Sequence, residues 1–133
     1  MAKSKSMQER TEELVERRHQ VELGGGEARL DKQRAQGKLT ARERIDALLD
    51  PGTFQETGMF ARHHSHYFGL ADAELPADGV VTGAGAVLGR PVHIASQDFT
   101  VAGGSAGEVH SDKVAAMMKA SLMTGTPFVF IND

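Results

Sequence analysis

The sequence contains no cysteine and no tryptophan, and it has one tyrosine and four prolines among 133 residues. The lack of cysteine excludes disulfide frameworks, thiolate zinc sites, iron–sulfur clusters and cysteine nucleophiles. Long apolar runs are also missing, since none approaches the ~20 residues that a membrane-spanning helix needs. The formal net charge is only -3, which favours neither nucleic acid nor an anionic membrane as a partner.

What the chain does contain is typical of a folded globular protein. Hydrophobic residues make up 40% of it, and 15 glycines add to the apolar share. Residues 1–18 mix basic side chains with Glu9, Glu12, Glu13 and Glu16, whereas secretory and organellar leader peptides avoid acidic residues. We therefore expect a cytoplasmic protein.

Charge is concentrated in the first 50 residues, which hold 11 of the 15 Lys and Arg and 10 of the 18 Asp and Glu. The composition changes at Pro51. We therefore expect a polar N-terminal helical segment over residues 1–50 and a second unit over residues 51–133.

Glycines at 24–26 and at 37 divide the first segment into three predicted helices. The first, over about 7–23, is too polar to form a core by itself. In the third, Thr40 and Glu43 form a capping box at the start of the helix. Its apolar residues, Ile45, Leu48 and Leu49, share one face of the helix and precede Pro51.

The second unit shows strand patterns. Residues 78–88 and 91–97 are predicted strands, and Gly89-Arg90 is the two-residue turn expected between them. The continuous apolar run over 128–131 is typical of a strand covered on both faces, as in parallel sheets.

A helix is predicted over residues 111–124, with Ser111 or Asp112 as its cap and Gly125 as its stop. The apolar residues expected to share its buried face are Val114, Met117, Met118 and Leu122. The order is therefore hairpin, helix and buried strand.

The glycine-rich segment Gly103, Gly104, Ser105, Ala106 and Gly107 precedes this helix and allows three interpretations. It matches the nucleophile elbow G-x-S-x-G, but an elbow needs an acid and then a histidine after its serine. The only histidine after the serine precedes both remaining aspartates. The alternatives are a connecting turn and a ligand loop, because small residues before a helix let backbone N–H groups approach an anion or a thioester oxygen. The ligand loop is our leading candidate, with no side chain assigned as catalytic.

His63, His64 and His66 form a tract that could chelate a metal ion. No acidic or cysteine ligand is obvious beside them. The interpretation that we favour is an exposed polar loop, and we expect no metal in this chain.

Several runs together resemble one family. They lie at residues 23–26 (LGGG), 37–45 (GKLTARERI), 48–54 (LLDPGTF), 78–83 (DGVVTG) and 97–105 (QDFTVAGGS). In this order they resemble the start of the carboxyltransferase (beta) subunits of biotin-dependent acyl-CoA carboxylases, most of all the propionyl-CoA carboxylase type. The resemblance extends from about residue 8 to Asp133.

The resemblance implies an α/β fold built from crotonase-like (ClpP-like) ββα units, preceded by the N-terminal helical segment, and an incomplete domain. In the family the strand that corresponds to 128–133 continues into a Ser-Gly-Gly-Ala-Arg segment, whose amides form an oxyanion hole. Much of the acyl-CoA pocket belongs to a later domain. We therefore expect this chain to be incomplete as an enzyme.

The implied reaction is transfer of a carboxyl group from carboxybiotin to the α-carbon of a short-chain acyl-CoA. The resemblance implies biotin on a partner carrier protein, a coenzyme A thioester as substrate, a biotin carboxylase or carrier subunit as partner, and a hexamer for the full-length family. It places the loop Gly103–Gly107 near the acyl-CoA and biotin site. The alternative is a non-catalytic module that binds coenzyme A or joins an oligomer.

Overall fold

The computed structural model describes residues 5–133, so residues 1–4 of the expected helical segment lie outside the described part. The main elements, in chain order, are α1 (Met7–Glu22), α2 (Glu27–Ala35), α3 (Ala41–Leu48), β1 (Gln55–Thr57), β2 (Val80–Val87), β3 (Arg90–Gln97), α4 (Glu108–Thr124) and β4 (Phe128–Ile131). Two short 3₁₀ turns, Pro76–Gly79 and Ala102–Gly104, precede β2 and α4.

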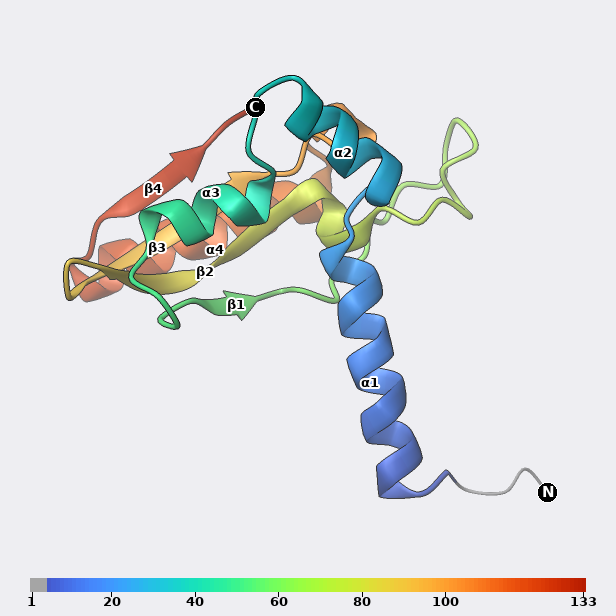
Figure 1. The fold of residues 1–133 in the computed structure, drawn as a ribbon, viewed down its shortest axis with the longest axis horizontal. Helices are drawn as coiled ribbons and strands as arrows, with labels where there is room; N and C mark the ends of the chain where they lie inside the picture. The colour runs from blue at the N-terminus through green and yellow to red at the C-terminus, as the bar shows by residue number, and fades with distance from the viewer. Residues whose placement is uncertain (1–4) are drawn as a thin grey trace.

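The strands form one sheet in the order β1-β2-β3-β4. β2 and β3 make an antiparallel hairpin, and β4 lies parallel to β3. α3 covers one face of the sheet and α4 the other, whereas α1 projects away from this body (Figure 1). The predicted sequence of hairpin, helix and parallel strand is thus confirmed. Within residues 5–133 no helix combines the length and apolar character needed to cross a membrane.

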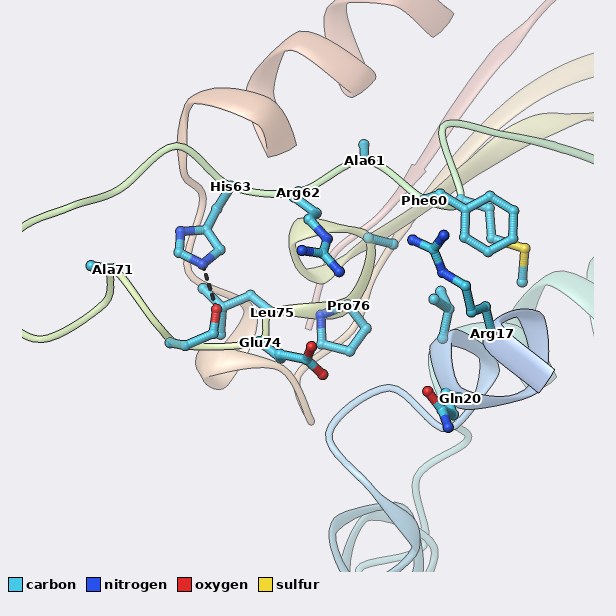
Figure 2. Close-up of a pocket in the computed structure, with 14 residues that line it drawn as sticks. Arg17, Gln20, Phe60, Ala61, Arg62, His63, Ala71, Glu74, Leu75 and Pro76 are labelled. Carbon is cyan, nitrogen blue, oxygen red and sulfur yellow. Dashed lines mark hydrogen bonds between the residues drawn. The ribbon is translucent and has the colours of Figure 1, made fainter. Parts of the chain in front are cut away.

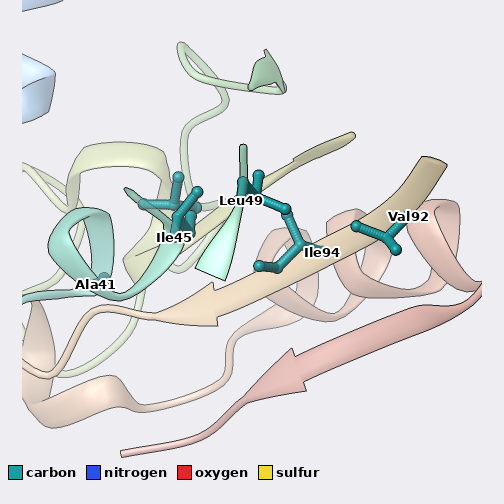
Figure 3. Packing of buried hydrophobic residues seen from close by; sticks show 6 residues of the cluster. Ala41, Ile45, Leu49, Val92 and Ile94 are labelled. Carbon is teal, nitrogen blue, oxygen red and sulfur yellow. The ribbon is translucent and has the colours of Figure 1, made fainter. Parts of the chain in front are cut away.

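The main apolar cluster lies between α3 and the sheet. The predicted capping box is present at the start of α3: Thr40 Oγ1 accepts from Glu43 N at 3.3 Å, and Thr40 N donates to Glu43 Oε2 at 2.8 Å. The buried members of the cluster are Ala41, Ile45, Leu49, Val81, Val92 and Ile94 (Figure 3). Ile45 and Ile94 are fully buried, so the narrow apolar stripe of α3 is the part of the polar segment that docks on the sheet.

The hairpin turn differs from the prediction by one residue. Val87 pairs with Arg90, so the turn is Leu88-Gly89 rather than Gly89-Arg90. Both turn residues have positive φ, 51° and 75°, as a type I′ turn requires. The carboxylate of Asp50 accepts hydrogen bonds from both of their amides, at 2.9 and 2.7 Å. This distant acceptor helps a leucine to occupy a backbone conformation that normally favours glycine.

The short strand β1 was not predicted, because three residues are too few to show an alternating pattern. It pairs with β2 through Glu56 and Gly83. A Cβ atom on Gly83 would lie 2.3 Å from the carbonyl oxygen of Gln55. The glycine therefore permits the close approach that adds β1 to the sheet.

Helix α4 starts at Glu108, three residues before the predicted start. Ser111 lies inside the helix, where its Oγ donates to the carbonyl of Gly107 at 2.9 Å. The prediction of Ser111 or Asp112 as the cap is therefore wrong. The helix ends as predicted at Gly125, which has a left-handed φ of 68°.

The buried face of α4 also differs from the prediction, because it is mostly polar. Its buried residues are His110, Lys113, Met117 and Ser121. Of the four residues expected to share that face only Met117 is buried, Val114 is half-buried, and Met118 and Leu122 are 54% and 85% exposed. The polar residues are buried on this face because backbone carbonyl groups beneath the helix accept their hydrogen bonds.

Lys113 shows this most clearly. Its Nζ donates to the carbonyl oxygens of Ala77 and Val80 at 2.7 and 2.5 Å. Burial lowers the pKa of Lys113 to about 8; the carboxylates of Glu56 and Asp78 oppose this shift, and Arg42 adds to it. Desolvation of the ammonium thus outweighs the nearby negative charge.

The predicted strand β4 is present and parallel, and the described residues cover only one of its faces well, as an incomplete domain implies. Val129 and Ile131 pack beside the cluster under α3. Phe130, on the opposite face, is 38% exposed. β4 is an edge strand among the described residues, so its apolar run is only half covered.

Replacing Ile45 by Ala is expected to lower the free energy of unfolding by about 2–5 kcal/mol, because the removed side chain leaves a cavity under α3. The measurement is urea denaturation followed by circular dichroism. Leu48→Ala is the control: the sequence predicted Leu48 on the same face as Ile45, but in the structure it is 37% exposed, so its loss should cost less than about 1 kcal/mol. Equal losses for the two variants would contradict this packing.

Stability should rise with pH because of Lys113. Its pKa is about 8 in the fold against an ordinary 10.5, so between these values the unfolded chain holds a proton that the folded chain has released. Linkage then makes the free energy of unfolding increase across this interval. Lys113→Met should flatten the rise relative to the wild type, and Lys119→Met, on the exposed side of α4, should not. The test is denaturant unfolding at a series of pH values from about 7 to 11.

Candidate functional site

The predicted ligand loop, Gly103–Gly107, lies where β3 and β4 both end. Gln97, the last residue of β3, donates from Nε2 to the carbonyl of Gly104 at 3.4 Å. Its Oε1 accepts from the amide of Asp133, just beyond β4, at 3.3 Å. In α/β folds the carboxyl ends of parallel strands are the usual place for ligands. The structure therefore brings the loop to a suitable edge of the sheet.

The backbone of the loop begins with a left-handed turn. Ala102, Gly103 and Gly104 have φ values of 48°, 65° and 72°, and two of the three are glycines, which adopt such values without strain. Hydrogen bonds close this turn, whereas the N–H groups of Ala106 and Gly107 make no hydrogen bond within residues 5–133. These two amides are available to an external acceptor.

Ser105 does not form the contact that a nucleophile elbow needs. Its Oγ donates to the carbonyl of Ala102 at 2.8 Å. The ring of His110 is buried, and its Nδ1 lies 2.9 Å from the carbonyl oxygen of Asp78. Each side chain is thus engaged with a different backbone carbonyl, and the serine hydrolase interpretation lacks its Ser–His pair.

The start of α4, directly after the loop, is capped by Asp78. One carboxylate oxygen, Oδ2, accepts from the amide of His110 at 2.8 Å. The cap lies 32 residues away in sequence, so no local pattern shows it. The sequence predicted Asp78 as the first residue of a strand, but β2 starts at Val80 and Asp78 lies in the 3₁₀ turn Pro76–Gly79 before it.

The triple glycine between α1 and α2 anchors the segment that leads into the loop. Gly25 N donates to Thr100 Oγ1 at 2.9 Å, and Arg29 Nη1 donates to the Thr100 carbonyl at 3.1 Å. A Cβ atom on Gly25 would lie 1.9 Å from that carbonyl oxygen. The sequence predicted only that these glycines separate two helices. The structure shows that they also allow the backbone at Gly25 to approach the backbone at Thr100.

A cluster of polar side chains fixes the chain end of β4 beside the loop. The carboxylate of Asp133 accepts from Lys38 Nζ at 2.9 Å, from Arg44 Nη2 at 2.7 Å, and from Gln33 Nε2. Burial alone would raise the pKa of Asp133, but these hydrogen bonds and the charge of Arg44 bring it below its ordinary value. The carboxylate is therefore held in its charged form.

The three histidines of the tract do not converge. His63 Nε2 lies 2.7 Å from the carbonyl of Ala73, and its Nδ1 accepts from the amide of Ser65 at 3.2 Å. His64 Nδ1 lies 3.7 Å from a carboxylate oxygen of Glu108. Within residues 5–133 no group of three or more potential metal ligands is found. The tract lies in an irregular loop, as the sequence predicted.

A separate cavity of about 280 Å³ lies between α1 and the segment over residues 59–77 (Figure 2). Arg17, Arg62 and Glu74 bring charges of both signs to it, and the guanidinium of Arg17 stacks 5.7 Å from the ring centre of Phe60. No residue of the Gly103–Gly107 loop lines it. We take the loop as the candidate site because it offers unpaired amides at the carboxyl edge of the sheet.

Comparison with known proteins identifies the family to which this chain is similar. Residues 32–133 match the model of the carboxyl transferase domain family. The chain is 58% identical over 128 residues to the methylmalonyl-CoA carboxyltransferase 12S subunit of Propionibacterium freudenreichii subsp. shermanii, covering 96% of this chain and 24% of that protein. It is 47% identical over 128 residues to the propionyl-CoA carboxylase carboxyltransferase subunit of Haloferax mediterranei, covering 96% of this chain and 25% of that protein.

The same relationship holds for a solved structure. The transcarboxylase 12S hexamer with methylmalonyl-coenzyme A and methylmalonic acid bound superposes with a TM-score of 0.96 at 56% identity, covering 98% of this chain and 26% of that one. The expected fold, a crotonase-like ββα unit after a helical segment, is confirmed. This chain spans about a quarter of the length of its relatives. It belongs to the carboxyl transferase domain family.

Proposed function

We propose that this chain is part of a carboxyltransferase subunit of a biotin-dependent acyl-CoA carboxylase, one that acts on a short-chain acyl-CoA of the propionyl-CoA type. The names of the relatives, a methylmalonyl-CoA carboxyltransferase and a propionyl-CoA carboxylase, support this substrate class. The chain covers about a quarter of their length, so the proposal gives it one wall of the site rather than the whole of it.

The two unpaired amides of Ala106 and Gly107 are the observation on which the proposal depends. In carboxyl transfer, negative charge develops on a carbonyl oxygen, either that of the thioester or that of the biotin ureido group. Preorganised N–H groups stabilise such a charge, and the loss of one donor typically costs about 3–4 kcal/mol in the barrier. The proposed role of Gly103–Gly107 is therefore contact with an acyl-CoA or biotin carbonyl through its backbone.

The proposal also includes the partners. Carboxybiotin on a separate carrier protein supplies the carboxyl group, and a biotin carboxylase component loads that carrier. Assembly into a hexamer is proposed from the solved 12S relative, which is a hexamer. The proposed location is the cytoplasm.

Substitutions in the loop test this role through binding of propionyl-CoA, measured by calorimetry. Gly104→Val should weaken binding by about tenfold or more, because a β-branched residue is strained at the φ of 72° found there. Ser105→Ala should change binding less than about twofold, since its hydroxyl already bonds the Ala102 carbonyl and the site uses the backbone. Circular dichroism controls for folding of both variants.

Two outcomes would contradict the proposal. One is unchanged binding in folded Gly104→Val, which would remove the loop from the site. The other is ester hydrolysis by the wild type that disappears in Ser105→Ala, which would support a serine hydrolase instead. With carboxybiotin and propionyl-CoA, this chain alone is expected to bind the thioester without turnover.

A further inference from the structure

The cavity between α1 and the irregular segment before β2 is separate from the Gly103–Gly107 loop, and the proposed function does not use it (Figure 2). It is lined by the buried residues Met59 and Ala77 and by exposed charged residues, Arg17, Arg62 and Glu74. Its volume of about 280 Å³ lies just below the range typical of sites for drug-sized ligands. The cavity is therefore of a size that suits a small metabolite.

The charged side chains at this cavity are not paired with one another. Within residues 5–133 no ion pair involves Arg17, Arg62 or Glu74. Glu13, one turn before Arg17 on α1, forms its ion pair with Lys5. Figure 2 shows the two guanidinium groups and the carboxylate of Glu74 around the same space. A ligand in that space would be in reach of charges of both signs.

One hydrogen bond fixes two of these charges on facing limbs of the irregular segment. His63 Nε2 lies 2.7 Å from the carbonyl oxygen of Ala73, and it joins the limb that carries Arg62 to the limb that carries Glu74. Each charged residue is the immediate neighbour of one member of this bond. Opposite charges thus face one cavity from fixed backbone positions without closing on each other as an ion pair.

The third charge comes from α1 and is also held in place. The guanidinium of Arg17 lies 5.7 Å from the ring centre of Phe60, a cation–π contact that orients the planar group. A guanidinium presents its N–H donors in a fixed fork that matches a carboxylate. The cavity therefore offers two places for a carboxylate, at Arg17 and Arg62, and one acceptor for an ammonium group, at Glu74.

We propose that this cavity binds a free acidic amino acid, with its two carboxylates at Arg17 and Arg62 and its ammonium group at Glu74. The reason is charge complementarity, because each charge of the ligand then meets one of opposite sign. A dicarboxylate without an ammonium group would instead leave Glu74 facing negative charge. The inference goes beyond the proposed function and does not depend on it.

The test is isothermal titration calorimetry of the 133-residue chain with free L-glutamate and, separately, with succinate. L-Glutamate should bind the wild type with a Kd of about 1 mM or tighter. Succinate, which lacks the ammonium group, should bind at least about fivefold more weakly. Arg62→Gln should weaken L-glutamate binding by about fivefold or more, because a charge-assisted hydrogen bond to a carboxylate is lost.

Glu74→Gln tests the ammonium position. It should weaken L-glutamate binding by about threefold or more and strengthen succinate binding, because it removes both an attraction and a repulsion. Asp72→Asn is the matched control, since Asp72 is exposed on the same segment but does not line the cavity, and it should behave as the wild type. The three changed side chains are exposed, and circular dichroism checks that each variant is folded.

The absence of saturable L-glutamate binding to the folded wild type up to about 20 mM would overturn the inference. Equal affinities for succinate and L-glutamate would also overturn it, as would an unchanged L-glutamate affinity in folded Arg62→Gln. An equal loss in Asp72→Asn and Glu74→Gln would show a general effect of surface charge and contradict the site. Displacement of bound L-glutamate by propionyl-CoA would contradict its separation from the loop.

Discussion

The hydrogen bonds between α4 and the Pro76–Gly79 turn are the interaction on which the rest of the unit depends. They determine where α4 begins, because its first turn is capped by a carboxylate from that turn. They also determine which face of α4 is buried, because the ammonium of Lys113 needs the carbonyls beneath it. Since the loop Gly103–Gly107 ends at the same helix start, its place relative to the sheet follows from this polar contact more than from apolar packing.

The order of elements could be predicted from the sequence because it depends on local signals. The capping box at Thr40, the strand patterns on either side of the hairpin and the left-handed stop at Gly125 each involve a few neighbouring residues. β1 was missed because its three residues are too few to show a pattern, whereas the errors in the hairpin turn and in α4 involve partners far away in the chain. Asp50 stabilises the Leu88-Gly89 turn from 38 and 39 residues away. On α4, buried carbonyl groups bind His110 and Lys113, although the apolar periodicity predicts that these polar residues face solvent.

The same distinction applies to the candidate site. The glycine-rich loop is visible in the sequence because its residue types are unusual. The residues that place it are not, since Gln97 and Asp133 are ordinary polar residues whose role depends on β3 and β4 lying side by side. The role of Gly25 is hidden in the same way. In the sequence it only indicates a break between helices, and its contact with Thr100 is visible only in the structure. Residue chemistry can therefore indicate a loop, while only tertiary contacts indicate what holds it.

The half-covered strand β4 affects how the chain behaves by itself. It pairs with β3 on one side and with no strand on the other among residues 5–133, and Phe130 lies partly exposed on it. An open edge with apolar side chains is a template for pairing with another polypeptide. At high concentration an isolated preparation will consequently tend to aggregate edge to edge, and dilution or a charged substitution at this strand will restore monodisperse material.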